Sequence, residues 1–132
     1  RDFVAVPDCY LGIIDDRDGR RIDWRSVDYH PGSPRYRMAA AGIPEVNGVL
    51  FIGGSENPYN YNGIGYNGQP SEPVQGALLF DIDTQGWHVL EFEGEATMDH
   101  RGLVPFKRQW LTVGGMTADQ RVTDRVASYQ LD

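Results

Sequence analysis

Apolar residues in this chain fall in short runs between polar positions. No window of about a dozen residues carries them at the i, i+3, i+4 and i+7 spacing of a helix without glycine or proline. The sixteen glycines and eight prolines divide the chain into pieces of strand length that are rich in β-branched and aromatic residues. The pattern therefore predicts an all-β protein. The expected strands lie at residues 10–15, 22–27, 37–42, 49–52, 77–82, 87–92, 102–106, 109–113 and 125–131.

Dipeptides that are typical of tight turns separate neighbouring strands. Asp18-Gly19 and Asn47-Gly48 accept the positive φ of short hairpin loops. Gln85-Gly86 and Lys107-Arg108 stand at equivalent breaks. We therefore expect the strands to form successive antiparallel hairpins.

An internal repeat organises these strands. The segment "NGVLFIGG" at residues 47–54 recurs as "RQWLTVGG" at residues 108–115. Each copy is an apolar run that two glycines close. An arginine opens a short strand upstream of each copy, Arg37 in the first and Arg101 in the second. We interpret these two arginines as equivalent positions, which either hydrogen bond to neighbouring backbone or line a channel mouth.

A strand with an aromatic and an acidic residue follows each copy after a loop. The first copy has Phe80 and Asp81, and the second has Tyr129 and Asp132. In the first copy Trp87 then opens a further strand after a short turn. The repeating unit is therefore predicted to be a four-stranded meander.

This order of features resembles the kelch repeat, in which each repeat is one blade of a β-propeller. The resemblance covers residues 35–93 as a complete blade and residues 100–132 as an incomplete blade that lacks its fourth strand. Residues 1–28 look like the last two strands of a preceding blade, with Trp24 in the tryptophan position. The resemblance implies one all-β domain over residues 1–132, a kelch-type β-propeller segment built of four-stranded antiparallel blades.

The implied ring is incomplete. Kelch repeats run about 50 residues and propellers typically have about four to eight blades, so 132 residues hold only two to three. Either this chain is a piece of a longer propeller, whose other part is missing or is a separate chain, or several copies of the chain close a ring together. The first residue is Arg1 rather than methionine, which suggests that an upstream segment has been removed. An isolated arc would leave apolar blade faces and sheet edges in water, where they favour association.

Glycine and aromatic residues have a physical role in such a repeat. The pairs Gly53-Gly54 and Gly114-Gly115 permit close approach of a neighbouring sheet and backbone angles that are barred to other residues. Trp87 and Phe80 are expected to fill the space between adjacent sheets.

The long loop, residues 55–76, is the main candidate for recognition, because it far exceeds the usual length of a connection. In a kelch propeller it is expected to share one face with the blade-to-blade segments at residues 28–35 and 94–101. Tyrosine supplies a large contact area and has few rotatable bonds to fix on binding, and asparagine supplies adaptable hydrogen-bond donors and acceptors. The candidate ligand-binding residues are Tyr59, Asn60, Tyr61, Asn62, Tyr66, His30, Arg35, His100 and Arg101.

The predicted function is a binding module that recognises a protein or a glycan through these loops. Three alternatives stay open. The chain could be a purely structural subunit of a larger complex, with the long loop buried against another chain. The long loop could fold over a blade edge, so that its tyrosines shield core while Asn62-Gly63 and Asn67-Gly68 only turn the chain. The propeller could also belong to an enzyme, galactose-oxidase-like or otherwise carbohydrate-active, whose active site needs blades outside this chain. None of the ligand motifs of galactose oxidase maps onto the sequence, and no catalytic residue is assigned.

Acidic turns do not complete a metal site. Asp15–Gly19 and Asp81–Gly86 place carboxylates before a glycine, as calcium loops do, but neither supplies the full ligand set. His88 is expected to be structural. His30 and His100 lie in segments of the expected loop face, where a shared metal or acid–base role stays an open alternative. We predict no metal site and no cofactor.

Charge and cysteine content narrow the partners further. Nineteen acidic and twelve basic residues give a net charge of -7, which repels phosphate backbones and anionic lipid, so no nucleic-acid partner is expected. No apolar run approaches the roughly 18 residues that cross a bilayer, so no membrane partner is expected either. The one cysteine, Cys9, has no second thiol to pair with and is interpreted as structural.

Overall fold

The computed structural model of the protein describes residues 3–131 and contains nine β-strands and two short 3-10 helices within them. All strand pairs are antiparallel, and none of the sheets closes into a barrel. The predicted all-β class is therefore confirmed. The elements are β1 (Cys9–Ile14), β2 (Ile22–Val27), β3 (Ala39–Ile43), η1 (Pro44–Val46), β4 (Gly48–Ile52), β5 (Ala77–Asp81), β6 (Gly86–Leu90), β7 (Val104–Phe106), β8 (Gln109–Val113), η2 (Ala118–Gln120) and β9 (Val126–Tyr129).

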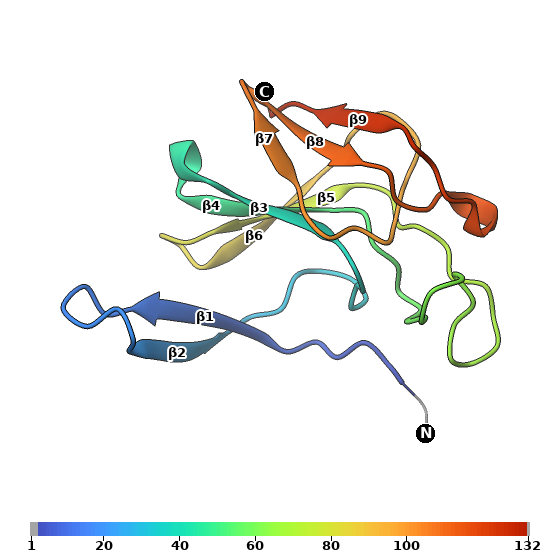
Figure 1. The fold of residues 1–132 in the computed structure, drawn as a ribbon. Coiled ribbons are helices and arrows are strands. Elements are labelled where there is room, and N and C mark those ends of the chain that lie inside the picture. The colour runs from blue at the N-terminus through green and yellow to red at the C-terminus, as the bar shows by residue number, and fades with distance from the viewer. Residues whose placement is uncertain (1–2, 132) are drawn as a thin grey trace.

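Three sheets follow one another along the chain and in space (Figure 1). β1 and β2 form a hairpin, β3 to β6 form a four-stranded meander, and β7 to β9 form a three-stranded sheet. The four-stranded sheet lies between the other two (Figure 1). Asn47, Gln85 and Lys107 adopt positive φ at the predicted breaks, which confirms the expected hairpins.

The internal repeat is visible in the strand register. Val49 of β4 pairs with Phe80 of β5, and Trp110 of β8 pairs with Tyr129 of β9. The two glycine-closed segments therefore align residue by residue with each other, and so do the aromatic strands that follow them. Asp132, the acidic residue of the second copy, lies outside the described residues, as does Arg1.

The start of each unit differs from the sequence interpretation. A bridge between Tyr36 and Ser55 opens the first unit, and a bridge between Met98 and Met116 opens the second. The residues that follow, Arg37 and Asp99, share a left-handed backbone, with φ of 55° and 64°. The counterpart of Arg37 is therefore Asp99 rather than Arg101. What repeats at this position is the backbone conformation and not the side chain, so matching the two arginines misaligned the units.

The paired glycines behave as predicted. Gly53 and Gly54 have φ of 67° and 85°, and Gly114 and Gly115 have φ of 67° and 104°. A Cβ on Gly53 would lie 2.2 Å from the carbonyl oxygen of Thr97, which belongs to the segment before the next sheet. Glycine is thus required here both for the backbone angle and for the close approach of another chain segment.

One hydrophobic core lies between the four-stranded and three-stranded sheets. Ile43, Leu50 and Ile52 of the former belong to one buried cluster with Leu103 and Tyr129. Burying an aliphatic or aromatic side chain of this size contributes about 1.5–3 kcal/mol, so this cluster is the main source of stability for the pair of sheets.

Aromatic residues occupy the opposite face of the four-stranded sheet. The rings of Phe80 and Trp87 lie 4.9 Å apart, and the indole N–H of Trp87 donates to the carbonyl oxygen of Asp28 at 2.7 Å. Trp87 and Phe80 therefore fill the space on this side, as predicted. Trp24 is exposed, because its face of the β1–β2 hairpin is open in the described part of the chain.

Candidate functional site

The long loop and the loop of the next unit meet at one end of the molecule (Figure 1). Ser55 pairs with Pro73 to close the base of the long loop, and Met116 pairs with Val122 at the matching position of the second unit. The side-chain amide of Gln120 joins the two loops. It donates to the carbonyl oxygen of Ser71 at 3.0 Å and to Oε1 of Glu72 at 2.8 Å.

Asparagine side chains hold the long loop in a defined shape. Nδ2 of Asn57 donates to Oδ1 of Asn67 at 3.2 Å and to the carbonyl oxygen of Gln69 at 3.1 Å. The hydroxyl of Ser71 donates to the carbonyl oxygen of Asn57 at 2.7 Å. These bonds replace a strand ladder, so a segment without regular strands still has a fixed backbone.

The tyrosines of the long loop divide between core and surface. Tyr59 is fully buried in a cluster with Met98, Met116 and Tyr36, and burial raises the pKa of its phenol to about 12. The shielding role that the sequence left open thus applies to Tyr59. Tyr61 is 77% exposed, and its neighbours Asn60 and Asn62 and the more distant Tyr66 are exposed as well. Tyr59 is therefore not part of an exposed binding surface, whereas the other loop residues that were proposed are open to solvent.

Arg37 and Arg101 both bind the carboxylate of Asp99. Nη1 of Arg37 lies 2.7 Å from Oδ1 of Asp99, and Nη1 of Arg101 lies 3.0 Å from the same oxygen. The guanidinium of Arg37 also lies over the rings of Tyr36 and Tyr59, 4.8 Å and 5.0 Å from their centroids. Arg37 therefore joins two successive units, while Arg101 reaches the same carboxylate from an exposed position.

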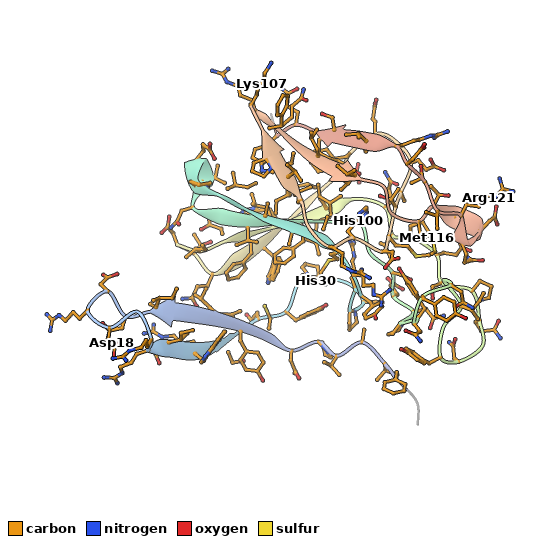
Figure 2. All side chains as sticks on the ribbon, viewed as in Figure 1. Asp18, His30, His100, Lys107, Met116 and Arg121 are labelled. Atoms are coloured by element: carbon orange, nitrogen blue, oxygen red, sulfur yellow. The ribbon has the colours of Figure 1, made fainter. Side chains whose placement is uncertain are left out.

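The two histidines of the predicted face are buried inside the molecule (Figure 2). The ring of His100 packs directly against Gly115, because a Cβ on Gly115 would lie 2.7 Å from that ring. Nε2 of His100 is hydrogen bonded to the hydroxyl of Thr97 at 2.8 Å. Burial lowers the pKa of His100 more than the nearby Asp99 carboxylate raises it. His100 therefore stays neutral at pH 7 and packs between glycines.

His30 has a different environment from His100. Its Nδ1–H donates to the carbonyl oxygen of Pro31 at 2.8 Å, and its ring packs against Tyr29 and Trp87 at 4.0 Å and 5.7 Å. Burial lowers its pKa as well. The half-buried Arg35 donates its backbone N–H to the hydroxyl of Tyr29 at 3.2 Å.

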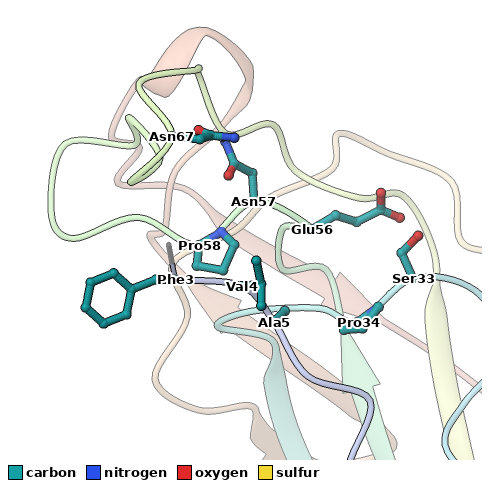
Figure 3. A pocket seen from close by; sticks show the side chains of 9 residues that line it. All are labelled: Phe3, Val4, Ala5, Ser33, Pro34, Glu56, Asn57, Pro58 and Asn67. Atoms are coloured by element: carbon teal, nitrogen blue, oxygen red, sulfur yellow. The ribbon is translucent and has the colours of Figure 1, made fainter. Parts of the chain in front are cut away.

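A pocket of about 350 Å³ lies beside the long loop, between three segments that are distant in sequence (Figure 3). Phe3, Val4, Ala5, Pro34 and Pro58 provide apolar walls, and Ser33, Glu56, Asn57 and Asn67 provide polar groups. The ring of Phe3 lies 4.5 Å from the ring of Tyr66, so an aromatic pair stands at its edge.

Sequence reasoning found the loop that forms this pocket but missed the residues that line it. Glu56, Asn57 and Asn67 lie within the predicted recognition loop, although their neighbours were chosen instead. The loop contains three asparagine–glycine or asparagine–proline dipeptides, which are typical of turns. They are the sequence feature that could have indicated asparagine side chains held in place by hydrogen bonds. The wall at residues 3–5 carried no local signal, because its position depends on how the β1–β2 hairpin packs.

A second hollow of about 380 Å³ lies along residues 117–125 and Glu95. Its walls are mainly charged residues and threonines, with Ala118 and Val122 as the apolar members, and the ion pair between Arg125 and Glu95 at 3.1 Å joins the two segments. It has fewer apolar lining residues than the first pocket, and small-ligand sites are mostly apolar, so the first pocket is the better candidate.

Two features are absent from residues 3–131. No group of three or more histidine, cysteine, aspartate or glutamate residues there is arranged to hold a metal ion. Over the same residues, no helix combines the length and the apolar character needed to span a membrane.

The fold has a counterpart among solved structures. The chain is similar to the structure of YjhT, with a TM-score of 0.69 and 11% sequence identity. The match covers 95% of this chain and 36% of that chain, so this chain spans little more than a third of the length of the structure that it matches. At this identity the likeness shows the fold alone. No family model matches the sequence, and no curated protein does.

Proposed function

We propose that this chain is an arc of a kelch-type β-propeller that binds a neutral glycan in the pocket beside the long loop. The pocket carries the proposal, because it combines apolar walls with a carboxylate, two amides and a hydroxyl in one small hollow. The remaining blades of the ring are its expected partners, supplied by another polypeptide or by further copies.

Three observations support the propeller arrangement. The two glycine-closed segments share one strand register, the sheets follow one another as layers, and each glycine pair has the same left-handed backbone. The fold also matches part of a longer chain. Such repeats cannot bury their sheet faces alone, so an arc of this size is expected to need neighbours.

The size of the pocket favours a small ligand over a protein. About 350 Å³ falls at the lower end of the range of about 300–1,000 Å³ that is typical of small-molecule sites. A stable protein interface instead buries upwards of about 1,000 Å² of surface. One or two sugar rings therefore fit the pocket better than a protein surface does.

The chemistry of the pocket favours hydroxyl groups without charge. Glu56 accepts hydrogen bonds. Both N–H groups of Asn57 are donated within the loop, and Oδ1 of Asn67 accepts from Asn57 and from the backbone N–H of Gln69, so a ligand meets Oδ1 of Asn57 as an acceptor and Nδ2 of Asn67 as a donor. Acceptors and a donor together match the hydroxyl groups of a polyol. The bond between these two amides holds them in place before a ligand arrives and so reduces the ordering cost of binding. Glu56 and the net charge of -7 disfavour an anionic sugar.

Titration calorimetry with glucose, galactose and mannose, and with glucuronate as the charged counterpart, tests this function. We expect at least one neutral sugar to bind and glucuronate to bind more weakly. Glu56→Gln and Asn67→Ala are each expected to weaken binding about tenfold or more, which corresponds to about 1.4 kcal/mol.

Tyr61→Ala is the matched control, because Tyr61 belongs to the same loop but does not line the pocket. Its affinity should equal that of the unmodified chain. Full binding by Glu56→Gln, or loss of binding in Tyr61→Ala alone, would contradict the pocket and favour the exposed tyrosine as the site.

A further inference from the structure

The four-stranded sheet has two faces of different character, because side chains alternate along each strand. Leu50, Ile52 and Ala77 lie on one side, which we call the aliphatic face. Phe80 and Trp87, which pair with each other in β5 and β6, lie on the other, which we call the aromatic face.

Inside the chain, the aliphatic face of one sheet packs on the aromatic face of the next. The aliphatic face of the four-stranded sheet shares a core with Trp110 and Tyr129 of the three-stranded sheet. By register, Trp110 and Tyr129 are the counterparts of Val49 and Phe80. They therefore belong to the aromatic face of their own sheet.

The same rule describes the hairpin. Leu11 and Val27 lie on one face of the β1–β2 pair and are half-buried, and the segment that follows at Asp28 accepts the indole N–H of Trp87. The part of this face around Leu11 and Val27 thus lies toward the aromatic face of the four-stranded sheet, whereas Ile13, Asp23 and Arg25 on the same face are exposed.

The other face of the hairpin is apolar and open. Strand register places four large apolar side chains on it together, each between 45% and 63% exposed. They are Tyr10, Ile14, Ile22 and Trp24. Trp24 gives this face the character of the aromatic faces that are covered elsewhere in the chain.

The outer face of the three-stranded sheet is also apolar and open. Val113 and Val126 are the counterparts of Ile52 and Ala77 by register, so this is an aliphatic face. Leu111, which pairs with Val104, is half-buried on this face, and four other large apolar side chains are between 51% and 64% exposed. They are Val104, Phe106, Val113 and Val126.

We propose that these two open faces bind each other between copies, so that the chain associates head to tail. The occupant of the face around Trp24 is the three-stranded sheet of a second copy, in the same kind of packing that the chain already makes between its own sheets. Such a contact is heterologous, and each added copy leaves one face of each kind open until a ring closes. The proposal does not depend on glycan binding.

A pair of complementary variants tests this interface in the 132-residue chain. Trp24→Glu blocks the open face of the hairpin and leaves the open face of the three-stranded sheet intact. Val113→Glu does the reverse. We expect sedimentation to show each variant alone as a monomer. An equimolar mixture should form a one-to-one complex that grows no further, because one competent face of each kind remains. The unmodified chain should form concentration-dependent species of about twice the monomer mass or more.

Val46→Glu is the matched control, because Val46 is an exposed valine in η1 outside both faces. It should associate like the unmodified chain. Circular dichroism checks that every variant is folded, and Ile22→Glu replaces Trp24→Glu on the same face if that variant is not.

Three results would overturn the proposal. They are a monomeric unmodified chain, continued association of either single variant, and a mixture of the two variants that stays monomeric. The first would mean that the two faces do not bind each other between copies, and the second would mean that each face binds itself or that the contact is unspecific.

Discussion

At the scale of single residues, Gly53 and Gly115 set how closely successive units approach. Gly53 faces the carbonyl oxygen of Thr97, and Gly115 faces the ring of His100 and the carbonyl oxygen of Met98. Both glycines also have a left-handed backbone. A side chain at either position would therefore have to move backbone that belongs to another segment.

Gly53→Ala is expected to lower the free energy of unfolding by more than about 2 kcal/mol, because its Cβ would overlap Thr97 and its φ is strained for alanine. Gly42→Ala is the matched control within the same sheet, since nothing lies within 4 Å of a Cβ there. Its unfolding free energy should change by less than about 1 kcal/mol. Urea denaturation measures both, and equal losses in the two variants would contradict the assigned role of Gly53.

The burial of His100 predicts acid sensitivity. Its pKa is lower in the folded chain than the ordinary value of 6.5, so protons bind more tightly to the unfolded state. Stability should be at its full value above about pH 6.5 and should fall as the pH drops toward the folded pKa. His30 adds a loss of the same sign.

Urea unfolding at a series of pH values between 5 and 8 tests this sensitivity. His100→Gln removes one titrating group, so its stability should depend less on pH in that range. His88→Gln, at an exposed position on β6, should keep the pH dependence of the unmodified chain. An unchanged slope in His100→Gln would show that the acid sensitivity arises elsewhere.

At the scale of elements, the local pattern of apolar and turn residues predicts where the strands lie. Two strands, residues 22–27 and 109–113, have the predicted bounds, and the rest differ by at most a few residues. β7 begins at Val104 rather than residue 102, and β9 ends at Tyr129 rather than residue 131. These ends depend on whether a neighbouring strand continues, which no local pattern specifies.

Gln120 is expected to control how rigid the long loop is, because its amide donates to two groups of that loop. In Gln120→Ala, hydrogen exchange of the Ser71 amide, which donates to the carbonyl oxygen of Gly63, should become about fivefold faster. Gln109→Ala is the control, since Gln109 bonds to Ser128 within the three-stranded sheet. Unchanged exchange in Gln120→Ala would mean that the loop holds its shape alone.

At the scale of the whole molecule, the candidate pocket depends on packing that position in the sequence does not show. The tyrosine and asparagine content of the long loop indicated the segment that borders the pocket, but Tyr59 is buried against Met98 and Met116. The pocket needs residues 3–5 and 33–34 beside the loop, and only the packing of whole sheets brings them there. His30 and His100 were likewise placed on a common face, yet each is buried in its own environment.

Two loops of very different length begin and end at equivalent bridges in the two units. Ser55 with Pro73 and Met116 with Val122 form equivalent bridges, although residues 56–72 lie between the first pair and only residues 117–121 between the second. The framework therefore tolerates insertion and deletion between these anchor points. Transplanting a foreign segment there offers a way to give the scaffold new specificity while its layers stay as they are.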